Sequence, residues 1–344
     1  MRLKGPQLKA WFIRSYGGPE VLEFGDVPEP VTGDRDVLVD IRAASVNPID
    51  IKVRQGELRR LVRYSFPLVM GTDLAGIVIG VGRDVRRFAV GDEVYARPNR
   101  HRIGAFAERI SVHEDEVALK PKSLTFEESA SLPLVALTSL QALVDIARVR
   151  PGHKVLIHAG AGGVGTFAIQ LARHLGAHVT TTASQPKHEL VRSLGAHQAI
   201  DYRDQDFALD LDECDMVFDT VGGDTLARSF KVLREGGIAV SVIGPPDLEM
   251  TRDWPMPWHL RLAIWAISWR VRRLAAKHRC RYRFMLMRPS GIQLAEVAAL
   301  ADGGVIRPVI GEVYPFDRVA EAIAHSEAGR ATGKIVVSRG ALVR

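Results

Sequence analysis

Residues 160–165 read Gly-Ala-Gly-Gly-Val-Gly and match the pattern Gly-x-Gly-x-x-Gly. An apolar, strand-like run at 154–158 precedes them, and apolar residues recur at helical spacing from Phe167 to Leu175. In this pattern the first glycine permits a tight turn, the second lets the backbone approach a pyrophosphate, and the third lets the helix pack against the strand. The amides at the start of such a helix face the phosphates. The sequence therefore predicts a dinucleotide-binding site at Gly160, Gly162, Gly163, Val164 and Gly165.

The residues after the next apolar run bear on which dinucleotide is bound. Sites selective for NAD place an acid about 20 residues beyond the loop, on the ribose hydroxyl. Here the run at 180–184 reads Thr-Thr-Thr-Ala-Ser and has no acid that would repel a phosphate. Ser184 can donate a hydroxyl hydrogen bond to a 2′-phosphate, and Lys187 can place a cation beside it. The alternative is that Lys187 is only a solvated lysine at the start of a helix. The pattern favours NADPH over NADH.

The segments around the loop alternate between strand-like and helix-like patterns, as a doubly wound sheet requires. The expected strands are 154–158, 178–182, 199–202, 216–221 and 238–243, with a sixth at 283–287. Residues 1–135 are β-rich instead, with short apolar runs punctuated by glycine and proline, and a helix at 136–147 leads into the sheet. A helix at 293–301 and a strand at 305–313 follow, and this last part is expected to return to the first domain.

Composition indicates a globular protein of two domains, because 344 residues exceed one ordinary core. Hydrophobic residues make up 47% of the chain and charged residues 25%, which is typical of folded proteins. The two cysteines, Cys214 and Cys280, exclude a disulfide framework and a cysteine-rich zinc lobe. We find neither a signal-like N-terminus nor an apolar run of about 18 residues, so a cytoplasmic protein is the expectation.

Several ordered motifs carry a resemblance to a known family. They are YGGPEVLE (16–23), SVNPID (45–50), FPLVMGTDLAGIV (66–78), GDEV (91–94), LPLVALTSLQAL (132–143), AGAGGVG (159–165), DYRD (201–204), IRPVI (306–310) and ATGKIVV (331–337). In these motifs the chain resembles the zinc-free quinone oxidoreductase branch of the medium-chain dehydrogenase/reductase superfamily. The TFAIQ at 166–170 and the RYRF at 281–284 look most like the reticulon-interacting NADPH oxidoreductases.

The resemblance implies an α/β fold in which a Rossmann doubly wound parallel sheet is joined to a GroES-like β-rich catalytic domain. The implied domains are 1–135 (GroES-like, catalytic), 136–288 (Rossmann, NADP-binding) and 289–344 (a return to the catalytic domain). It further implies cofactor contacts from Ser184, Lys187 and Tyr202. Additional cofactor contacts are implied for Thr138 near the nicotinamide, Ile243 and Gly244 beside the ribose, and Lys334 at the cleft, besides Asn47 at the nicotinamide end.

Zinc-dependent members of the superfamily carry a metal-binding cysteine near position 45 and a Gly-His-Glu sequence, whereas this chain has Ser45 and Gly71-Thr72-Asp73. We therefore expect no metal. Without zinc to polarise an alcohol, a hydride acceptor that is already electron-poor is favoured, with the cofactor carrying the reaction. A quinone or an α,β-unsaturated carbonyl accepts a hydride at carbon while its oxygen gains negative charge, which Asn47, Tyr64 or a water can stabilise. Asp50 is a catalytic candidate, with the alternative that it only holds the Asn47 loop.

The predicted function is zinc-independent, NADPH-dependent reduction of a quinone or enone, in an expected homodimer. Two alternatives stay open: an enoyl-thioester reductase with the same fold and cofactor, and a non-catalytic, NADPH-binding protein like the lens crystallins of this family.

The stretch 252–288 departs most from a minimal Rossmann domain. It holds ten arginines and lysines against one acid, Asp253, and its net charge of +9 exceeds the +6 of the whole chain. Five apolar residues step at helical spacing and predict one helix face, with three tryptophans alongside. The five are Leu260, Ile264, Ile267, Val271 and Leu274. Three interpretations compete: packing on the cofactor domain or a dimer mate, a lid over an apolar acceptor, and contact with an anionic membrane. Specific nucleic-acid binding is not expected.

Overall fold

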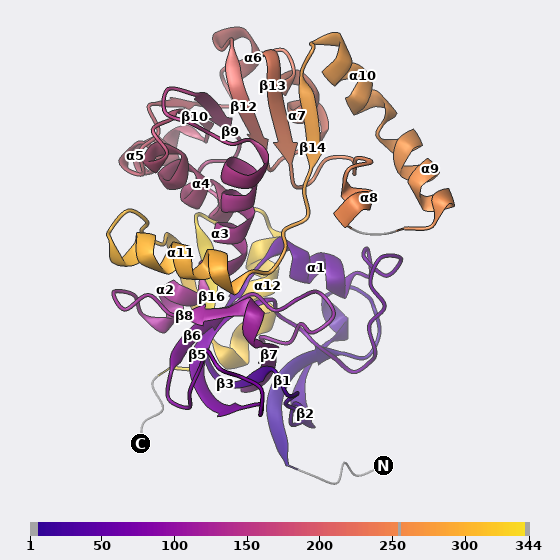
Figure 1. The fold of residues 1–344 in the computed structure, drawn as a ribbon, viewed down its shortest axis with the longest axis vertical. Coiled ribbons are helices and arrows are strands. Elements are labelled where there is room, and N and C mark those ends of the chain that lie inside the picture. Colours follow the sequence, from indigo (N-terminus) through magenta and orange to yellow (C-terminus); the bar gives the residue numbers. More distant parts are fainter. Residues whose placement is uncertain (1–5, 254–255, 341–344) are drawn as a thin grey trace. The chain divides into compact units, whose positions relative to one another are not determined.

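The structure, a computed structural model, describes residues 6–253 and 256–340. Contacts between Cα atoms divide the chain into two units: unit 1 comprises Met1–Leu137 and Arg288–Arg344, and unit 2 comprises Thr138–Met287. The α/β class expected from the sequence is confirmed, because a parallel sheet in unit 2 accompanies the β-rich unit 1 (Figure 1). The roles of the units, catalytic for unit 1 and cofactor-binding for unit 2, remain predictions.

Unit 1 contains two sheets, with strand orders β2-β1-β4 and β15-β16-β3-β5-β6-β8, and β7 pairs with β3. The strands are β1 (Gln7–Ile13), β2 (Leu22–Pro28), β3 (Asp36–Val46), β4 (Leu68–Val69), β5 (Asp73–Val81), β6 (Glu93–Ala96), β7 (Arg109–His113), β8 (Val117–Leu119), β15 (Ile310–Pro315) and β16 (Lys334–Ser338). The long strand β3 alternates, so that Val37, Val39 and Ile41 are buried in the core while the residues between them are less buried. Because β16 pairs antiparallel with β3, the end of the chain returns to the sheet that the first domain forms.

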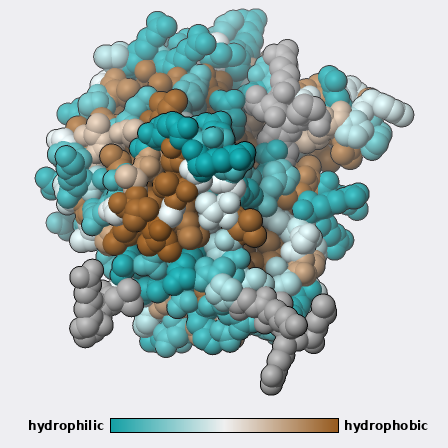
Figure 2. All heavy atoms as spheres, turned by 60° about the horizontal axis from the view of Figure 1, so that its bottom comes forward, coloured by the Kyte–Doolittle hydropathy of each residue, from teal (hydrophilic) through white to brown (hydrophobic). Residues whose placement is uncertain are grey.

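Among the described residues, four α-helices lie wholly in unit 1: α1 (Pro48–Arg54), α2 (Phe126–Ala130), α11 (Gly291–Asp302) and α12 (Val319–Glu327). The helix expected at 293–301 is thus present, whereas the strand expected at 305–313 occupies Ile310–Pro315. Figure 2 shows one face of the molecule, which is mainly hydrophilic with hydrophobic side chains gathered in one area. Exposed apolar side chains of unit 1 include Ile79 and Val81 on β5 and Leu119 on β8.

Unit 2 is built on a sheet of six parallel strands in the order β11-β10-β9-β12-β13-β14. They are β9 (Lys154–Ile157), β10 (His178–Thr182), β11 (Gln198–Ile200), β12 (Cys214–Asp219), β13 (Leu233–Ser241) and β14 (Arg281–Phe284). This is the Rossmann strand order 3-2-1-4-5-6. From β9 the chain adds strands first on one side, β10 and β11, and then on the other, β12 to β14. Such folds bind ligands at this switch point, between β9 and β12. All six expected strands exist, but their ends differ by a few residues, and β14 begins two residues earlier than expected.

The other helices are α3 (Pro133–Leu140), α4 (Gly163–His174), α5 (His188–Ser193), α6 (Phe207–Asp210), α7 (Gly223–Ser229), α8 (Met250–Asp253), α9 (Trp258–Ile267) and α10 (Trp269–Lys277). The helix expected at 136–147 starts earlier, at Pro133, and changes to a π-helical turn over Gln141–Ile146. Helix α4, which follows the glycine loop, buries its apolar residues against β9 and β10.

The single amphipathic helix expected across 258–274 is wrong in two respects. The chain forms two helices, α9 and α10, because Ser268 ends the first and begins the second. Ile264 and Val271 are buried as expected, but Ile267 is 61% exposed. Residues 254–255 of the basic stretch lie outside the described residues, as do the side chains of Arg252 and Asp253.

Candidate cofactor and catalytic sites

The glycine loop of unit 2 is a turn too tight for side chains at two of its glycines. A Cβ atom on Gly160 would lie 2.0 Å from Thr181 Oγ1, and one on Gly165 would lie 2.4 Å from the Ala159 carbonyl oxygen. The Gly160 amide donates to the Thr182 carbonyl oxygen at 2.9 Å, which joins the loop to the end of β10. These two glycines therefore perform the first and third roles that the motif predicts.

Gly162 differs because the protein leaves space beside it. A Cβ atom there would meet only the Ala159 carbonyl oxygen, at 3.3 Å. Gly162 directly precedes α4, whose first residues are Gly163 and Val164, and all three are partly exposed. Backbone amides of a helix's first turn lack intrahelical partners and carry the positive end of the dipole. The open approach and the amides fit a pyrophosphate, as the second glycine of the motif requires.

Ser184 and Lys187 lie where β10 ends, around the short 3-10 helix Gln185–Lys187. Lys187 is partly exposed, and no carboxylate pairs with it within 6–253 and 256–340. Asp201, at the end of β11, accepts a hydrogen bond from the Gln185 amide at 2.8 Å and so ties the two strand ends together. This tie places the Ser184 turn beside the segment that follows Asp201.

Tyr202 follows Asp201 and is exposed, and the Arg203 guanidinium lies 5.7 Å from the centre of its ring. The backbone amide of Arg203 also donates a hydrogen bond to Asp201 Oδ1 at 3.0 Å. Sequence reasoning missed Arg203; the only available signal was a cation directly after Tyr202 in the DYRD motif. With Ser184 and Lys187, these residues present a hydroxyl, a phenol and two cations, which is a donor set suited to a phosphate.

Ile243 and Gly244 follow β13 as expected. Ser241 Oγ accepts hydrogen bonds from both of their amides, at 3.3 and 2.8 Å, and donates to buried Asp219 at 2.6 Å. A Cβ atom on Gly244 would lie 2.6 Å from the Tyr282 hydroxyl, so packing alone demands glycine there. The Ile243 side chain is 46% exposed and free to contact a ligand.

Two further residues of unit 2 that the sequence brings into question, Thr138 and His158, are buried. Thr138 lies inside α3. His158, at the end of β9, contacts Thr182 and Ser229 through its two ring nitrogens, at 3.2 and 2.9 Å. Burial lowers the pKa of His158 to about 4, so the imidazole is neutral at physiological pH and links β10 to α7. Its contacts give it a packing role.

In unit 1, Asn47 lies between β3 and α1 and its side chain is fully engaged. The amide nitrogen donates to Asp73 Oδ2 at 2.9 Å and to Thr72 Oγ1 at 3.2 Å, and the amide oxygen accepts from Lys334. Asn47 is 1% exposed. The amide is therefore held by the protein, and it orients neighbouring groups more readily than it binds a substrate oxygen.

Asp73 and Lys334 form the centre of a buried charged cluster. Lys334 Nζ lies 3.7 Å from Asp73 Oδ2 and donates to the Val46 carbonyl oxygen at 3.1 Å. Arg97 Nε lies 3.9 Å from Asp73 Oδ1, which also accepts from the Leu134 amide at 3.1 Å. Burial lowers the pKa of both Lys334 and Arg97, and the nearby carboxylates oppose that effect. Lys334, expected at the cofactor, is thus bonded to Asn47 within unit 1.

Asp50 accepts a hydrogen bond from the Asn47 backbone amide at 2.8 Å through Oδ2, which secures the start of α1. Its other oxygen, Oδ1, is buried without a hydrogen-bond partner in the described structure. Burial raises the pKa of Asp50 to about 7, so this carboxyl keeps its proton at pH values where an exposed aspartate is ionised. The geometry matches the positioning role considered for Asp50 and also leaves one oxygen unengaged.

Tyr64 is partly buried against the core of unit 1. Burial raises its pKa to about 12, while the Arg97 charge acts in the opposite direction. Its hydroxyl makes no hydrogen bond to any residue in the described ranges. The phenol is therefore protonated at physiological pH and available to donate. Sequence reasoning found Tyr64 but missed Arg97, whose buried charge no local pattern reveals.

Where zinc-dependent members carry the cysteine and Gly-His-Glu, this chain has Ser45 and Gly71-Thr72-Asp73, and Ser45 Oγ donates to Asp73 Oδ2 at 3.1 Å. No group of three or more histidine, cysteine or acidic side chains is arranged to hold a metal in the part of the chain that the structure describes. The only carboxylate at these positions is engaged by Lys334, Asn47 and Ser45.

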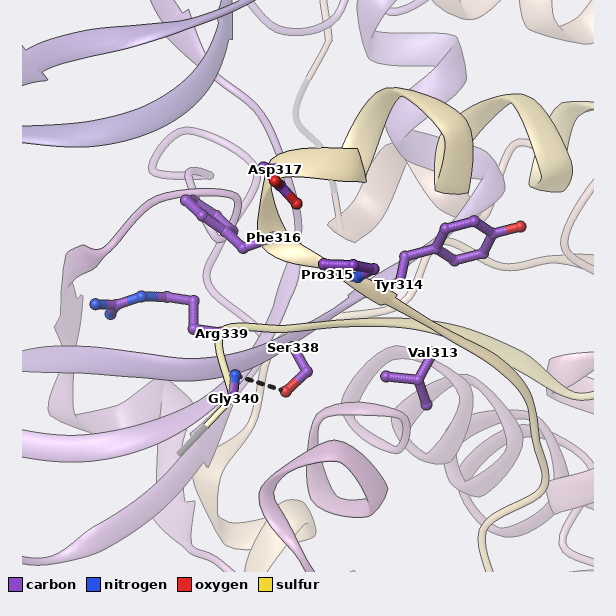
Figure 3. A pocket seen from close by; sticks show the side chains of 8 residues that line it. All are labelled: Val313, Tyr314, Pro315, Phe316, Asp317, Ser338, Arg339 and Gly340. Atoms are coloured by element: carbon purple, nitrogen blue, oxygen red, sulfur yellow. Dashed lines mark hydrogen bonds between the residues drawn. The ribbon is translucent and has the colours of Figure 1, made fainter. Parts of the chain in front are cut away.

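A pocket of about 540 Å³ lies elsewhere in unit 1 (Figure 3). It is lined by the end of β15, the end of β16 and the turn after each: Val313, Tyr314, Pro315, Phe316, Asp317, Ser338, Arg339 and Gly340. None of the candidate site residues lines it, so we assign it no part in the cofactor or catalytic site.

Comparison with known proteins places the chain in a family. Residues 33–122 match the alcohol dehydrogenase GroES-like domain, and residues 194–337 match the zinc-binding dehydrogenase family model. The human mitochondrial NAD(P)H oxidoreductase RTN4IP1 is 37% identical, covering 96% of this chain and 89% of that protein. The chloroplastic NADPH-dependent alkenal/one oxidoreductase of Arabidopsis thaliana is 34% identical, covering 96% and 79%. The structure of a quinone oxidoreductase from Coxiella burnetii superposes with a TM-score of 0.83 at 33% identity, covering 97% and 99%.

The chain therefore belongs to the medium-chain dehydrogenase/reductase superfamily, as its GroES-like and Rossmann units indicate. Its relatives within that superfamily include the RTN4IP1 oxidoreductases and the quinone oxidoreductases, which confirms the resemblance read from the motifs.

Proposed function

We propose that this protein is an NADPH-dependent, zinc-independent oxidoreductase that transfers a hydride to a quinone or an α,β-unsaturated carbonyl. The observation that carries the proposal is the juxtaposition in unit 2 of an open glycine loop with a phosphate-suited turn. Gly162 leaves the start of α4 open, and Ser184 and Lys187 follow β10 without an acid to oppose a 2′-phosphate. The names of the relatives, which include NAD(P)H, quinone and alkenal/one oxidoreductases, support the same activity.

When bound, the reduced nicotinamide supplies the hydride, and the protein's own groups bind, orient and protonate. Tyr64 is the candidate donor to the acceptor oxygen, because its hydroxyl is protonated and has no partner among the described residues. Asn47 and Lys334 have a positioning role, because their polar side-chain atoms already form hydrogen bonds within the cluster around Asp73. Asp50 holds the first turn of α1 through the Asn47 amide.

Zinc independence follows from the donor chemistry at Asp73. A zinc ion in a catalytic site takes about three protein ligands, usually histidine, cysteine or a carboxylate. Asp73 is paired with Lys334, and Ser45 replaces a thiolate. Exhaustive dialysis against a strong chelator should leave NADPH-dependent turnover intact. Zinc present in stoichiometric amount, and lost together with activity, would refute this part of the proposal.

The activity itself is tested by following NADPH oxidation by absorbance with a panel of acceptors. The panel contains a 1,4-quinone, an enone and an enoyl thioester, each at matched concentration. Turnover of the quinone or enone is expected. Preference for the thioester favours the enoyl reductase alternative. NADPH binding without turnover of any acceptor favours a non-catalytic binding protein, and no NADPH binding rejects all three.

We propose a homodimer in addition. Strand β14 ends the six-stranded sheet, and within the described residues it pairs only with β13, so its outer edge holds backbone groups able to pair with a second copy. Mass measurement by light scattering during gel filtration tests this. We also propose a cytoplasmic address. The two relatives named above carry other addresses, mitochondrial and chloroplastic. Cell fractionation tests the proposal.

A further inference from the structure

Helices α9 and α10 lie at the margin of unit 2 (Figure 1). They expose an unusual set of large apolar side chains. The set, called the tryptophan patch below, consists of Trp258, Leu262, Trp265, Ile267 and Trp269, with exposed fractions between 49% and 72%. Trp258, Leu262 and Trp265, all on α9, step by four and three residues, which is the spacing of one helix side. Exposed apolar groups gathered in this way mark interaction surfaces in soluble proteins.

The helices themselves are held to unit 2 by their opposite side. Val271 and Ala275 of α10 are buried in the core cluster that includes Phe230 and Ala239, and Ile264 is the buried side chain of α9. The tryptophan patch is therefore not an unfilled part of that core. It points away from the contacts that fix the helices.

Cations surround the patch without acids to balance them. Residues 256–288 contain nine arginines and lysines and no acid. Within the described ranges, Arg261, Arg270, Arg272, Arg273 and Lys277 form no ion pair. Other arginines of the same stretch are paired: Arg279 lies 3.2 Å from Glu235, and Arg283 lies 2.6 Å from Glu249. These five unpaired cations all lie on the two helices.

Two of these cations lie directly against the tryptophans. The Arg272 guanidinium is 5.0 Å from the centre of the Trp265 ring, and the Arg273 guanidinium is 5.4 Å from that of Trp269. Arg272 also donates to the Trp265 carbonyl oxygen at 2.8 Å. Each of these guanidinium groups thus lies over the ring of an exposed tryptophan, so that a charge and an apolar ring are in contact. This pairing suits the boundary of a bilayer, where acyl chains meet phosphates.

We propose that the tryptophan patch and its unpaired cations dock the protein on an anionic lipid surface, with α9 and α10 lying along it. Charge complementarity selects this occupant: a second copy facing through the same patch would bring like charges together. Nucleic acid would satisfy the cations but leave Leu262 and Ile267 exposed. Contact is peripheral, because no helix in the described ranges has the length and apolar character needed to cross a bilayer. The inference does not depend on the proposed activity.

Flotation of the full-length protein with vesicles tests the proposal. Phosphatidylcholine vesicles with and without phosphatidylglycerol are compared at low and high salt, because attraction to anionic lipid is screened within about 10 Å at 0.1 M salt. Binding only to the phosphatidylglycerol vesicles, with loss at high salt, is expected. Absence of binding to them at low salt overturns the proposal.

Matched variants assign the binding to the patch. Arg272→Gln with Arg273→Gln should weaken vesicle binding about fivefold for each charge removed. Arg59→Gln with Arg60→Gln removes the same charge from exposed positions of unit 1 and should leave binding unchanged. Equal loss in both pairs means that net charge alone drives binding and overturns the assignment. Circular dichroism and NADPH binding confirm that each variant is folded.

A third variant, Trp265→Ala with Trp269→Ala, separates the remaining occupants. Loss of vesicle binding with an unchanged mass in solution supports lipid docking. If these substitutions change the oligomeric state and leave vesicle binding unchanged, the patch is an interface between copies and the proposal is wrong. A competition with a DNA duplex tests the other occupant. If the duplex displaces the protein from vesicles at equal charge concentration, and vesicles do not displace the protein from the duplex, the cations bind nucleic acid and the proposal is wrong.

Discussion

Lys334 donates a hydrogen bond to the side-chain oxygen of Asn47, which precedes it by 287 positions. Lys334 is the first residue of β16, and Asn47 follows β3, so the antiparallel pairing of these two strands creates the contact. The same ammonium lies 3.7 Å from buried Asp73. One cation therefore neutralises the carboxylate of Asp73, in the segment where zinc-dependent members carry Gly-His-Glu, and fixes the orientation of the amide beside it.

Replacing Lys334 by methionine should destabilise unit 1 strongly. The substitution removes the cation beside Asp73 Oδ2, so that Arg97, 3.9 Å from Oδ1, is the one cation left in the described cluster. It also leaves the Asn47 oxygen without its donor. Removing one partner of a buried pair costs about 3 to 5 kcal/mol of unfolding free energy. The control is Lys9→Met, because Lys9 lies 2.9 Å from Asp26 in an ion pair that is half exposed. That variant should lose less than about 1 kcal/mol. Urea unfolding measures both, and equal losses would contradict a buried pair.

Replacing Asp50 by asparagine should change how stability depends on pH. The pKa of Asp50 is raised to about 7 in the folded protein, above its value of 3.8 in an unfolded chain. The folded state therefore binds the proton more tightly, and the wild type loses stability as pH rises from about 4 to about 7. The asparagine of the variant does not titrate at this position. The free energy of unfolding of the variant should therefore rise relative to that of the wild type from about pH 4 to about pH 7, by at most about 4 kcal/mol.

Asp36→Asn is the matched control for this titration. Arg102 holds the pKa of Asp36 at about 2, below its ordinary value. The contribution of Asp36 is therefore present above about pH 4 and is lost only as pH falls toward about 2. The stability difference between this variant and the wild type should stay constant between about pH 4 and about pH 7. A flat difference for Asp50→Asn over the same range would show that its carboxyl is not buried with a raised pKa.

Alanine substitutions at two loop glycines should separate folding from cofactor binding. A Cβ atom at Gly165 clashes with backbone at 2.4 and 2.6 Å, so Gly165→Ala should destabilise unit 2 by about 1 to 3 kcal/mol or more. Gly162→Ala meets one atom at 3.3 Å and should change stability little, while the new methyl group blocks the approach of a pyrophosphate. Thermal unfolding and NADPH titration measure the two effects. Intact NADPH affinity in Gly162→Ala would place the pyrophosphate elsewhere.

Lys187→Ala should weaken NADPH binding by about 1 to 3 kcal/mol, the range for a charge-assisted hydrogen bond, and leave NADH binding nearly unchanged. The reason is that only NADPH carries the 2′-phosphate. Lys231, an exposed lysine of the same unit, provides the control, since Lys231→Ala removes the same charge away from the turn after β10. Isothermal titration with both cofactors measures the difference. A wild type that binds NADPH and NADH equally well would contradict the assignment.

Much of unit 2 could be predicted from the sequence because its signals are local. Apolar runs, turn glycines and helical spacing lie within a few residues of one another, and each has one physical meaning. Element ends were less predictable, because the Pro133 start of α3 and its π-helical end depend on packing. The break at Ser268 escaped prediction for another reason. Periodicity shows that a helix has an apolar side, but α9 and α10 carry apolar residues on two sides, and spacing does not say which one is buried.

The sequence by itself determined the glycine loop after β9 and the absence of an acid at 180–184. It also determined that Ser45 and Gly71-Thr72-Asp73 stand where zinc-dependent members carry a cysteine and Gly-His-Glu. Each rests on residue identity and near spacing, which need no fold to interpret. Only the tertiary structure decided that Lys334, Asn47 and Asp73 form one buried cluster, and that Asp201 ties the turn after Ser184 to the end of β11. Those contacts arise from strand pairing between distant segments, and the cost of burying a charge is known only once its partners are in place.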